Sequence, residues 1–142
     1  MIKQSDNRPI SESVQPNRFS GIQILVIDDE MDSLNILKLV FEQEGAEVIS
    51  AASAKEALDI FNNSTPNLII SDIGMPEVDG YTLITEIRAL PQGKNLPAIA
   101  LSAYAGDVHR QRSLDVGFQE HLNKPVDLYN LLGVTIQLLG LG

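Results

Sequence analysis

Five short apolar runs, rich in β-branched residues, alternate along the chain with longer stretches whose apolar residues recur at helical spacing. Strands that are apolar on both faces need helices on both sides, which is the arrangement of a parallel sheet. The predicted strands are 22–27, 46–51, 67–71, 98–102 and 120–123, and the predicted helices are 33–44, 54–62, 81–89, 107–116 and 126–139. The pattern therefore predicts a doubly wound α/β domain around a five-stranded parallel sheet.

The two ends of the chain differ in character. Residues 1–20 are rich in Ser, Asn, Gln and Pro and contain few large apolar groups, so we expect a mobile polar leader followed by one domain over 21–142. Gly45 and Gly117 each stand between a predicted helix and a predicted strand, where a left-handed C-terminal cap suits glycine. After the last predicted helix the chain stops, and no output domain is expected.

The overall charge and composition exclude several functions. The 142 residues include 19 acidic and 10 basic side chains, a formal net charge of −9, so neither nucleic acid nor an anionic membrane is expected as a partner. The chain has no cysteine, which excludes disulfides, thiolate nucleophiles and thiolate metal sites. No apolar stretch has the length of a signal-peptide core or a membrane span, so we expect a cytoplasmic protein.

Polar and charged residues follow the predicted strands at the ends where ligands bind in open parallel sheets. Asp28 and Asp29 follow the first strand, Asp72 the third and Lys124 the fifth, and Ser102 ends the fourth. Three carboxylates, a hydroxyl and an ammonium group are therefore expected at one edge of the sheet.

Such a cluster of carboxylates needs a cation, because like charges in close contact repel one another. With only oxygen ligands available, Mg²⁺ fits best, since it binds one or two carboxylates, a backbone carbonyl and water. We expect Asp29 and Asp72 to coordinate the ion directly and Asp28 to hold a water ligand. A carboxylate beside such an ion can attack phosphorus and form an acyl phosphate, which Lys124 and Ser102 would then contact.

Each of these residues also has an ordinary structural interpretation. An Asp pair after a strand is commonly a solvated loop or a helix cap, and a Lys before Pro is commonly a surface charge. The combination is informative because every member independently stands at the edge where ligands bind.

Four motifs lie at these predicted strand ends. They are 24–30 (ILVIDDE), 72–76 (DIGMP) with 79–80 (DG) shortly after, 100–103 (ALSA) and 124–125 (KP). Together they resemble the response-regulator receiver domain of two-component signalling, over nearly everything from residue 22 to the C-terminus. The resemblance implies a flavodoxin-like (βα)5 fold with strand order 2-1-3-4-5.

The resemblance also implies roles for individual residues. Asp72 is then the phosphoacceptor, the carbonyl of Gly74 is a further metal ligand, Ser102 is a switch residue, and the Lys124–Pro125 peptide bond is cis. The phosphoryl donor would be a sensor histidine kinase or a histidine phosphotransfer protein, and a downstream protein would read the signal or receive the phosphoryl group. Such a domain catalyses only its own phosphorylation and dephosphorylation, so it is not an enzyme in the ordinary sense.

Two positions vary the family pattern. His121 stands where the family more often has a Tyr or Phe that turns inward on activation, so an imidazole there could make switching depend on pH. Tyr104, two residues after Ser102, and Gly74, two residues after Asp72, occupy sites that influence how water reaches the acyl phosphate. We expect the Tyr104 ring to shield it.

Two other functions stay open. A Mg²⁺-dependent phosphohydrolase of the haloacid-dehalogenase type also forms an aspartyl phosphate, and Asp28 would be its nucleophile. Against it, Glu30 stands where that family has Asp, and the chain has no inserted cap. The other alternative is a receiver-like interaction module that is never phosphorylated.

The expected docking surface for a partner comprises the fourth helix, the fifth strand and the last helix. On the last helix we expect Leu128, Leu132 and Leu139 to face the core, with Leu131 and Leu138 beside them. Tyr129 and Ile136 lie at the margin of that apolar stripe, so a homodimer through the last helices is a further alternative.

Overall fold

The computed structural model describes residues 18–103 and 106–141. Residues 1–17 of the predicted leader and the position of Tyr104 lie outside the described residues. The elements are β1 (Gln23–Ile27), α2 (Met31–Gln43), β2 (Glu47–Ala51), α3 (Ala54–Asn62), β3 (Leu68–Asp72), α4 (Gly80–Arg88), the 3₁₀-helix η1 (Pro91–Gly93), β4 (Ala98–Ser102), α5 (Asp107–Val116), β5 (Glu120–Asn123) and α6 (Leu128–Leu139). In the described part of the chain, no helix has the length and apolar character needed to cross a membrane.

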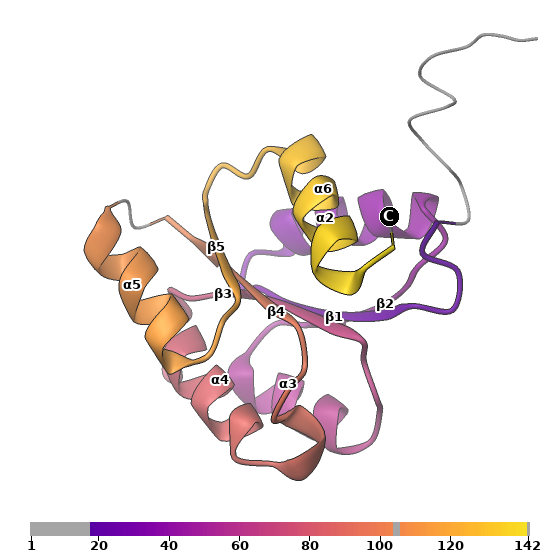
Figure 1. Cartoon of the computed structure of the whole chain (residues 1–142). Helices are drawn as coiled ribbons and strands as arrows, with labels where there is room; N and C mark the ends of the chain where they lie inside the picture. Colours follow the sequence, from indigo (N-terminus) through magenta and orange to yellow (C-terminus); the bar gives the residue numbers. More distant parts are fainter. Residues whose placement is uncertain (1–17, 104–105, 142) are drawn as a thin grey trace, which may run out of the picture.

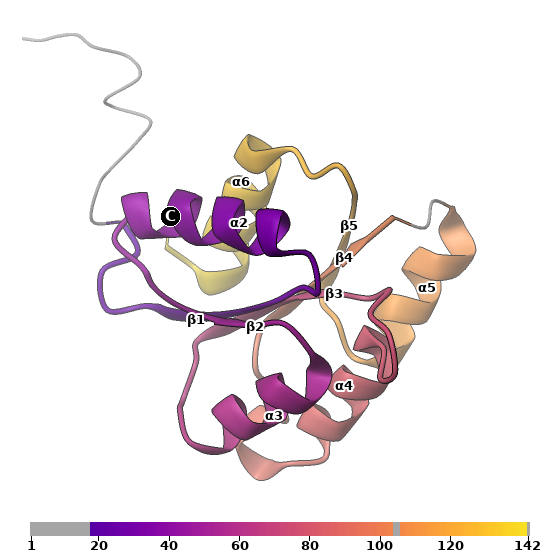
Figure 2. The same cartoon turned by 180° about the vertical axis from the view of Figure 1, so that it is seen from behind.

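The five strands form one parallel sheet in the order β2-β1-β3-β4-β5, as predicted. Helices α2 and α6 cover one face of the sheet, and α3, α4 and α5 cover the other (Figures 1 and 2). Each strand is followed by a helix, so all five carboxyl ends meet at the same edge.

The core has two layers because successive residues of a strand point to opposite faces. In β1, Ile24 and Val26 are buried with α2 and α6, whereas Leu25 and Ile27 are buried with α3 and α4. Every residue of β3 is buried, as expected for a strand covered on both sides.

Side-chain caps explain where two of the helices begin. Asp127 Oδ1 accepts hydrogen bonds from the N–H groups of Tyr129 (3.0 Å) and Asn130 (3.2 Å), so α6 begins at Leu128 rather than at the predicted residue 126. Asp79 Oδ1 caps α4 in the same way by accepting from the N–H of Thr82 at 2.9 Å. The remaining predicted boundaries agree with the structure to within two residues.

The two predicted glycine caps are confirmed. Gly45 has a φ angle of 95° and Gly117 has one of 129°, a region that side chains rarely adopt. Each therefore ends its helix and turns the chain back toward the sheet.

Phe19 lies within the predicted leader, but its side chain is fully buried. Its ring centroid is 5.7 Å from that of Phe41 on α2, and its backbone N–H donates to the carbonyl of Glu44 at 2.9 Å. Phe19 thus belongs to the core that α2 and α6 form on the sheet, and the packed part of the chain includes it.

The predicted apolar row of α6, Leu128, Leu132 and Leu139, does pack against the core, but its members are not the most buried residues of the helix. Leu131 and Thr135 are fully buried, whereas Leu128, Leu132 and Leu139 are only partly buried. Thr135 tolerates this position because its hydroxyl donates to the carbonyl of Leu131 at 2.8 Å within the same helix. Leu131, predicted to stand beside the row, is therefore at the centre of the apolar side of α6.

Candidate functional site

Three carboxylates meet where the first and third strands end. Strands β1 and β3 are neighbours and pair Ile27 with Ser71, so the next residues, Asp28 and Asp72, come side by side. Asp28, Asp29 and Asp72 each offer a carboxylate oxygen, and these oxygens all lie within 4.8 Å of one another. Asp28 and Asp72 are buried and Asp29 is exposed, so the cluster opens toward solvent through Asp29.

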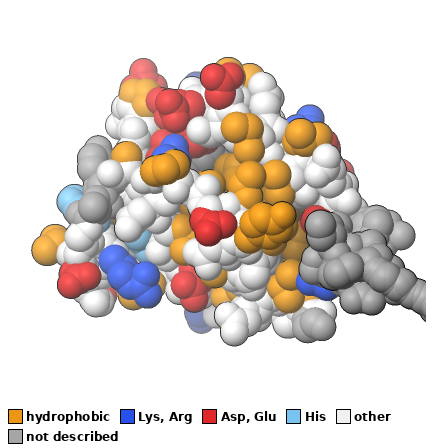
Figure 3. All heavy atoms as spheres, turned by 90° about the horizontal axis from the view of Figure 1, so that it is seen from above, with side chains coloured by type: hydrophobic (Ala, Val, Ile, Leu, Met, Phe, Trp, Pro, Cys, Tyr) orange, Lys and Arg blue, Asp and Glu red, His pale blue; other side chains and the backbone are white. Residues whose placement is uncertain are grey.

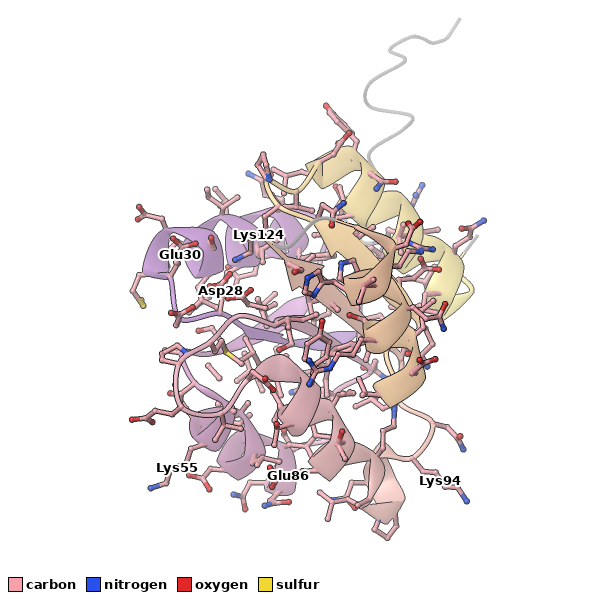
Figure 4. All side chains as sticks on the ribbon, turned by 90° about the vertical axis from the view of Figure 1, so that its left-hand side faces the viewer. Asp28, Glu30, Lys55, Glu86, Lys94 and Lys124 are labelled. Carbon is pink, nitrogen blue, oxygen red and sulfur yellow. The ribbon has the colours of Figure 1, made fainter. Side chains whose placement is uncertain are left out.

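Lys124 brings a positive charge to this cluster from the end of β5. Its Nζ donates to Asp28 Oδ2 at 2.8 Å and lies 3.5 Å from Asp72 Oδ1 and 3.8 Å from Glu30 Oε1. Figure 4 shows Asp28, Glu30 and Lys124 together at one end of the molecule, while the other labelled side chains lie away from them. The Lys124–Pro125 peptide bond is cis, as predicted.

The pKa of Asp72 is raised above its ordinary value. Burial is the largest cause, and the negative charge of Asp28 adds to it. Lys124 and the backbone N–H of Gly74, which donates to Asp72 Oδ1 at 3.3 Å, act in the opposite direction. These two effects do not offset burial and the charge of Asp28, so the pKa stays raised. A further cation that approaches would therefore stabilise the ionised form of Asp72.

The pKa of Lys124 is also raised. Burial by itself lowers it, but the hydrogen bond to Asp28 and the nearby charge of Asp72 together outweigh that effect. Lys124 is therefore firmly protonated, and it neutralises part of the negative charge around it.

A small pocket of about 290 Å³ opens beside these groups. It is lined by Asp29, Glu30, Asp72, Gly74, Ala103 and Lys124. Apart from Lys124, its charged lining consists of carboxylates, whose oxygens suit a hard divalent cation such as Mg²⁺. Asp28 already accepts hydrogen bonds from Lys124 and from the N–H of Glu30 (2.9 Å). The acidic cluster thus fits a metal site.

Ser102 lies at the end of β4, beside this pocket but fully buried. Its carbonyl accepts the backbone N–H of Lys124 at 2.7 Å, so β4 and the lysine loop are directly joined. Ala103, the next residue, lines the pocket itself.

His121, the other predicted switch residue, does not line this pocket. Its side chain is buried on the side of the sheet that carries α5, and its Nδ1 lies 2.7 Å from Ser113 Oγ. The prediction for Tyr104 concerns a residue outside the described part of the chain.

Sequence reasoning missed two features of the site. Glu30 was not predicted as a site residue, although its position directly after the Asp pair was a usable signal. The second is an apolar groove of about 550 Å³ between α2 and the loop that leads to α6, whose lining includes Ile36, Leu37, Leu101 and Val126. Because its walls come from separate segments, no local sequence pattern could predict it.

This apolar groove adjoins the acidic pocket. Both are lined by Glu30, Ala103 and Lys124. Figure 3 shows hydrophobic side chains gathered across the middle of the face formed by α2 and α6. A ligand entering the pocket therefore passes beside an apolar surface.

Fold and site together define a class of protein. It is the CheY-like, flavodoxin-like α/β domain with an acidic cluster and a lysine at the carboxyl edge of its sheet. The family model of the response regulator receiver domain matches residues 24–135. The chain belongs to this family.

Known proteins agree with this assignment. The chain is 47% identical over 116 residues to the "Uncharacterized 14.6 kDa protein in sodA1 3'region" of Leptolyngbya boryana. The aligned residues cover 82% of this chain and 88% of that protein. It is 33% identical over 111 residues to the sensor histidine kinase CheAY of Helicobacter pylori, which covers 77% of this chain but only 14% of the kinase. The crystal structure of a CheY-like response regulator receiver domain protein from Methanospirillum hungatei JF-1 is similar with a TM-score of 0.78 at 31% identity, covering 84% of this chain and 94% of that one.

Proposed function

We propose that Asp72 accepts a phosphoryl group from a phosphohistidine on a partner protein, a sensor histidine kinase or a histidine phosphotransfer protein. The observation that carries the proposal is the setting of Asp72, a buried carboxylate at the carboxyl edge of the sheet, near two further carboxylates and 3.5 Å from the ammonium group of Lys124. Membership of the receiver family supports the same role.

In the proposed reaction, a carboxylate oxygen of Asp72 attacks the phosphorus of the phosphohistidine. The new O–P bond forms as the P–N bond breaks, and the electron pair of the P–N bond stays on the imidazole nitrogen. The released imidazole then takes up a proton from solvent. Hydrolysis of the acyl phosphate by water restores the carboxylate and releases inorganic phosphate. The domain would thus catalyse only its own modification and its reversal.

The acidic cluster would hold Mg²⁺ for this reaction. Asp29, Asp72 and the carbonyl of Gly74 are the proposed direct ligands, and Asp28 is proposed to act through water. When bound, Mg²⁺ neutralises charge on the phosphoryl oxygens. Asp29 is exposed at the mouth of the cluster, so it is the carboxylate best placed to exchange its water shell for the ion.

Lys124 and Ser102 are proposed to contact the transferred group. The ammonium group of Lys124 is close enough to Asp72 to reach a phosphoryl oxygen with a small movement, since it lies 3.5 Å from Asp72 Oδ1. The hydroxyl of Ser102 would donate a hydrogen bond to the same group and so report its presence to β4. Tyr104 and Gly74 are proposed to set the lifetime of the acyl phosphate by controlling how water reaches it.

The central claim is tested by incubating the protein with Mg²⁺ and acetyl phosphate and measuring its mass. We expect a gain of one phosphoryl group that is abolished in Asp72→Asn and retained in Asp115→Asn, which changes an exposed carboxylate on α5 away from the site. Absence of labelling in the wild type would favour the interaction module that is never phosphorylated.

The same experiment separates the phosphohydrolase alternative. If the phosphoryl group were carried on Asp28, labelling would persist in Asp72→Asn and vanish in Asp28→Asn. We expect the opposite for Asp72→Asn, and for Asp28→Asn only slower labelling with weaker dependence on Mg²⁺, because Asp28 is proposed to support the ion without bearing the phosphoryl group.

The apolar groove beside the pocket is proposed to contact the phosphohistidine-bearing partner. Ile36 lines this groove and is 50% exposed, whereas Leu39, 58% exposed on the same helix, does not line it. With a phosphorylated histidine phosphotransfer protein as donor, Ile36→Glu should slow labelling of Asp72 at least tenfold and Leu39→Glu should slow it much less. Labelling by acetyl phosphate should be equal in both variants, which shows that the pocket itself is intact.

A homodimer through the last helices stays a proposal. Tyr129 on α6 is 83% exposed, and Ile136 on the same helix is partly buried. Sedimentation of Tyr129→Glu with and without Mg²⁺ and beryllofluoride tests it. Identical sedimentation of wild type and variant in both states would remove the dimer from consideration.

A further inference from the structure

A serine occupies a buried position of β3 where its neighbours on the adjacent strands are apolar. Ser71 is fully buried at the second-last position of this strand. It pairs with Ile27 of β1 and with Ala100 of β4, and both belong to the apolar layer that β1, β3 and β4 form with α3 and α4. Paired residues of neighbouring strands point to the same face, so the Ser71 side chain lies in this layer. A hydroxyl group buried there costs free energy unless it is hydrogen-bonded.

The partner of this hydroxyl is the backbone of the next residue. Ser71 Oγ donates to the carbonyl oxygen of Asp72 at 2.9 Å. The N–H of the same peptide unit, which is that of Ile73, donates to the carbonyl of Leu101 on β4 at 3.0 Å. The peptide between Asp72 and Ile73 is therefore held at both ends, by a neighbouring strand at one end and by a side chain at the other.

The direction of the Asp72 carbonyl explains why a side chain is needed. The N–H and the carbonyl of a trans peptide point in opposite directions, so this carbonyl points away from β4 and toward β1. The ladder between β1 and β3 ends with the pair of Ile27 and Ser71. The next N–H of the chain after β1, that of Asp28, donates to Ala51 of β2 at 3.1 Å. The Asp72 carbonyl thus lies beyond the end of the ladder, and Ser71 supplies a donor there.

The peptide that Ser71 holds also carries the carboxylate at the centre of the site. Asp72 Oδ1 lies 3.5 Å from Nζ of Lys124 and accepts the N–H of Gly74 at 3.3 Å. Both contacts are longer than strong hydrogen bonds to a carboxylate, which measure about 2.7–2.9 Å. The side-chain contacts of Asp72 are therefore loose, and the position of its carboxylate depends mainly on the backbone.

We propose that Ser71 is a positioning residue of this site, whose hydroxyl fixes the peptide between Asp72 and Ile73 and so holds the Asp72 carboxylate in place for Mg²⁺ and for attack on phosphorus. The use of the carboxylate rests on the proposed function, whereas the fixed peptide belongs to the unmodified protein. Ser71 does not line the acidic pocket, so it acts only through Asp72.

Amide hydrogen exchange of the unmodified full chain tests the fixed peptide. Ser71→Ala should speed exchange of the Ile73 amide about fivefold, the factor that corresponds to about 1 kcal/mol, the net worth of one hydrogen bond. Thr135→Val is the matched control, because it also removes a fully buried hydroxyl that donates to a backbone carbonyl, at 2.8 Å on α6. An equal change of Ile73 exchange in the two variants, or no change in either, would overturn the proposal.

Mass labelling with Mg²⁺ and acetyl phosphate tests the consequence for the site. At saturating Mg²⁺, Ser71→Ala should be labelled about fivefold more slowly than the wild type, because the carboxylate is held in place for a smaller fraction of the time. The dependence of the rate on acetyl phosphate concentration should not change, since Ser71 does not contact the donor. Thr135→Val should be labelled at the wild-type rate. Equal rates in the two variants would refute the positioning role.

A cysteine variant separates the hydrogen bond from the filled space. Ser71→Cys keeps a side chain of similar size, but a thiol is a weak donor, so this variant should be labelled as slowly as Ser71→Ala. A wild-type rate in Ser71→Cys would show that volume and not the hydroxyl matters, and the proposal would fall.

Failure of the proposed function gives a different result. If the wild type gained no phosphoryl group at Asp72, the proposed function and the role of Ser71 in it would both be wrong. Exchange of the Ile73 amide in the unmodified variants would still decide whether Ser71 fixes the peptide.

Discussion

At the scale of single residues, Lys124 is set against more negative charge than it can balance. Its one ammonium group contacts Asp28 at 2.8 Å and lies 3.5 Å from Asp72, and both carboxylates are buried. The exposed Asp29 adds to the same cluster. Burial, the largest cause, and this excess of negative charge together raise the pKa of Asp72 although a lysine stands beside it.

Asp72→Asn should therefore stabilise the protein in Mg²⁺-free buffer at neutral pH, on the order of 1 kcal/mol, the usual size of a single-site effect. The folded pKa of Asp72 is raised above its reference value of 3.8, so the fold disfavours the ionised form. Stability is thus lost as pH rises from about that value through the raised pKa, and the neutral amide avoids this loss. Urea denaturation of both proteins between pH 4 and pH 8 measures the difference.

The response to Mg²⁺ should have the opposite sign. Mg²⁺ at about 100 times its dissociation constant would stabilise the wild type by about 2.7 kcal/mol. In Asp72→Asn the gain should be much smaller, because a proposed ligand has lost its charge. Equal stabilisation of both proteins would show that the ion binds elsewhere.

His121 carries a second pH dependence, with a different sign. Burial lowers its pKa below the reference value of 6.5, the charges of Arg110 and His109 lower it further, and the side chain of Asn123 opposes them. The fold therefore prefers the neutral ring, so its contribution to stability is complete above about pH 6.5 and is lost as pH falls through the lowered pKa. We expect the free energy of unfolding to fall more steeply from pH 7 to pH 5 in the wild type than in His121→Phe.

His109→Gln is the matched control for this measurement. Its ring is less buried, and its charge is the smallest of the effects that shift the pKa of His121, so its removal should change the acid dependence much less than His121→Phe does. If the two variants lost stability in parallel with the wild type between pH 7 and pH 5, no histidine would account for the slope.

At the scale of elements, the first residue of α4 fixes the geometry around Asp72. A Cβ atom at Gly80 would lie 2.6 Å from the carbonyl oxygen of Asp72 and 2.9 Å from Cα of Ile73, closer than such atoms approach. The N–H of Gly80 donates to the carbonyl of Ile73 at 2.9 Å. The start of α4 therefore packs directly on the backbone that carries Asp72, and only glycine allows this approach.

Gly80→Ala should destabilise the protein by about 2–4 kcal/mol, because backbone on both sides must move apart to admit the methyl group. It should also slow the labelling of Asp72 by acetyl phosphate, since the displaced backbone includes Asp72 itself. Chemical denaturation and the rate of mass gain measure the two effects.

Gly133 offers a matched control on α6. A Cβ atom there would meet no heavy atom within 4 Å. Gly133→Ala should therefore stabilise the protein by about 0.5–1 kcal/mol through helix propensity alone and leave labelling unchanged. Similar losses of stability in the two variants would contradict the close approach at Gly80.

At the scale of the whole molecule, the core beneath α2 and α6 is completed from outside the regular elements. Phe19 precedes β1, is fully buried and packs against Phe41. Its contacts join the start of the described chain to the end of α2, as does the bond from its N–H to Glu44. The packed core therefore includes Phe19, which was predicted to lie in the polar leader.

A chain beginning at Arg18 should be more stable than one beginning at Gly21 by about 3–5 kcal/mol, the cost of deleting a buried Phe side chain. The full chain with Phe19→Ala should show a similar loss, which excludes an effect of the new terminus alone. Thermal and urea denaturation of the three proteins decide the matter, and equal stability of the two shortened chains would restore the predicted boundary at residue 21.

Local pattern predicted much of this protein. Strands β1 to β5 and their parallel pairing could be predicted from the spacing of apolar residues within short segments. Continuous apolar runs indicate buried strands, and apolar residues at helical spacing indicate the helices between them. Asp28, Asp29, Asp72 and Lys124 could be predicted as one site because parallel strands end at the same edge. These inferences need only the direction of each strand and the residue that ends it.

Tertiary packing decided the rest. Four features depend on segments that are far apart in sequence. They are the full burial of Leu131 on α6, the burial of Phe19, the bond between Ser113 and His121, and the groove beside the pocket. Periodicity shows that a helix has an apolar side, but several rotations satisfy it nearly equally, and only close packing against the sheet selects one. The sequence by itself thus determined which charges share an edge, and the tertiary structure decided which of them touch, because side-chain contacts depend on how distant segments pack.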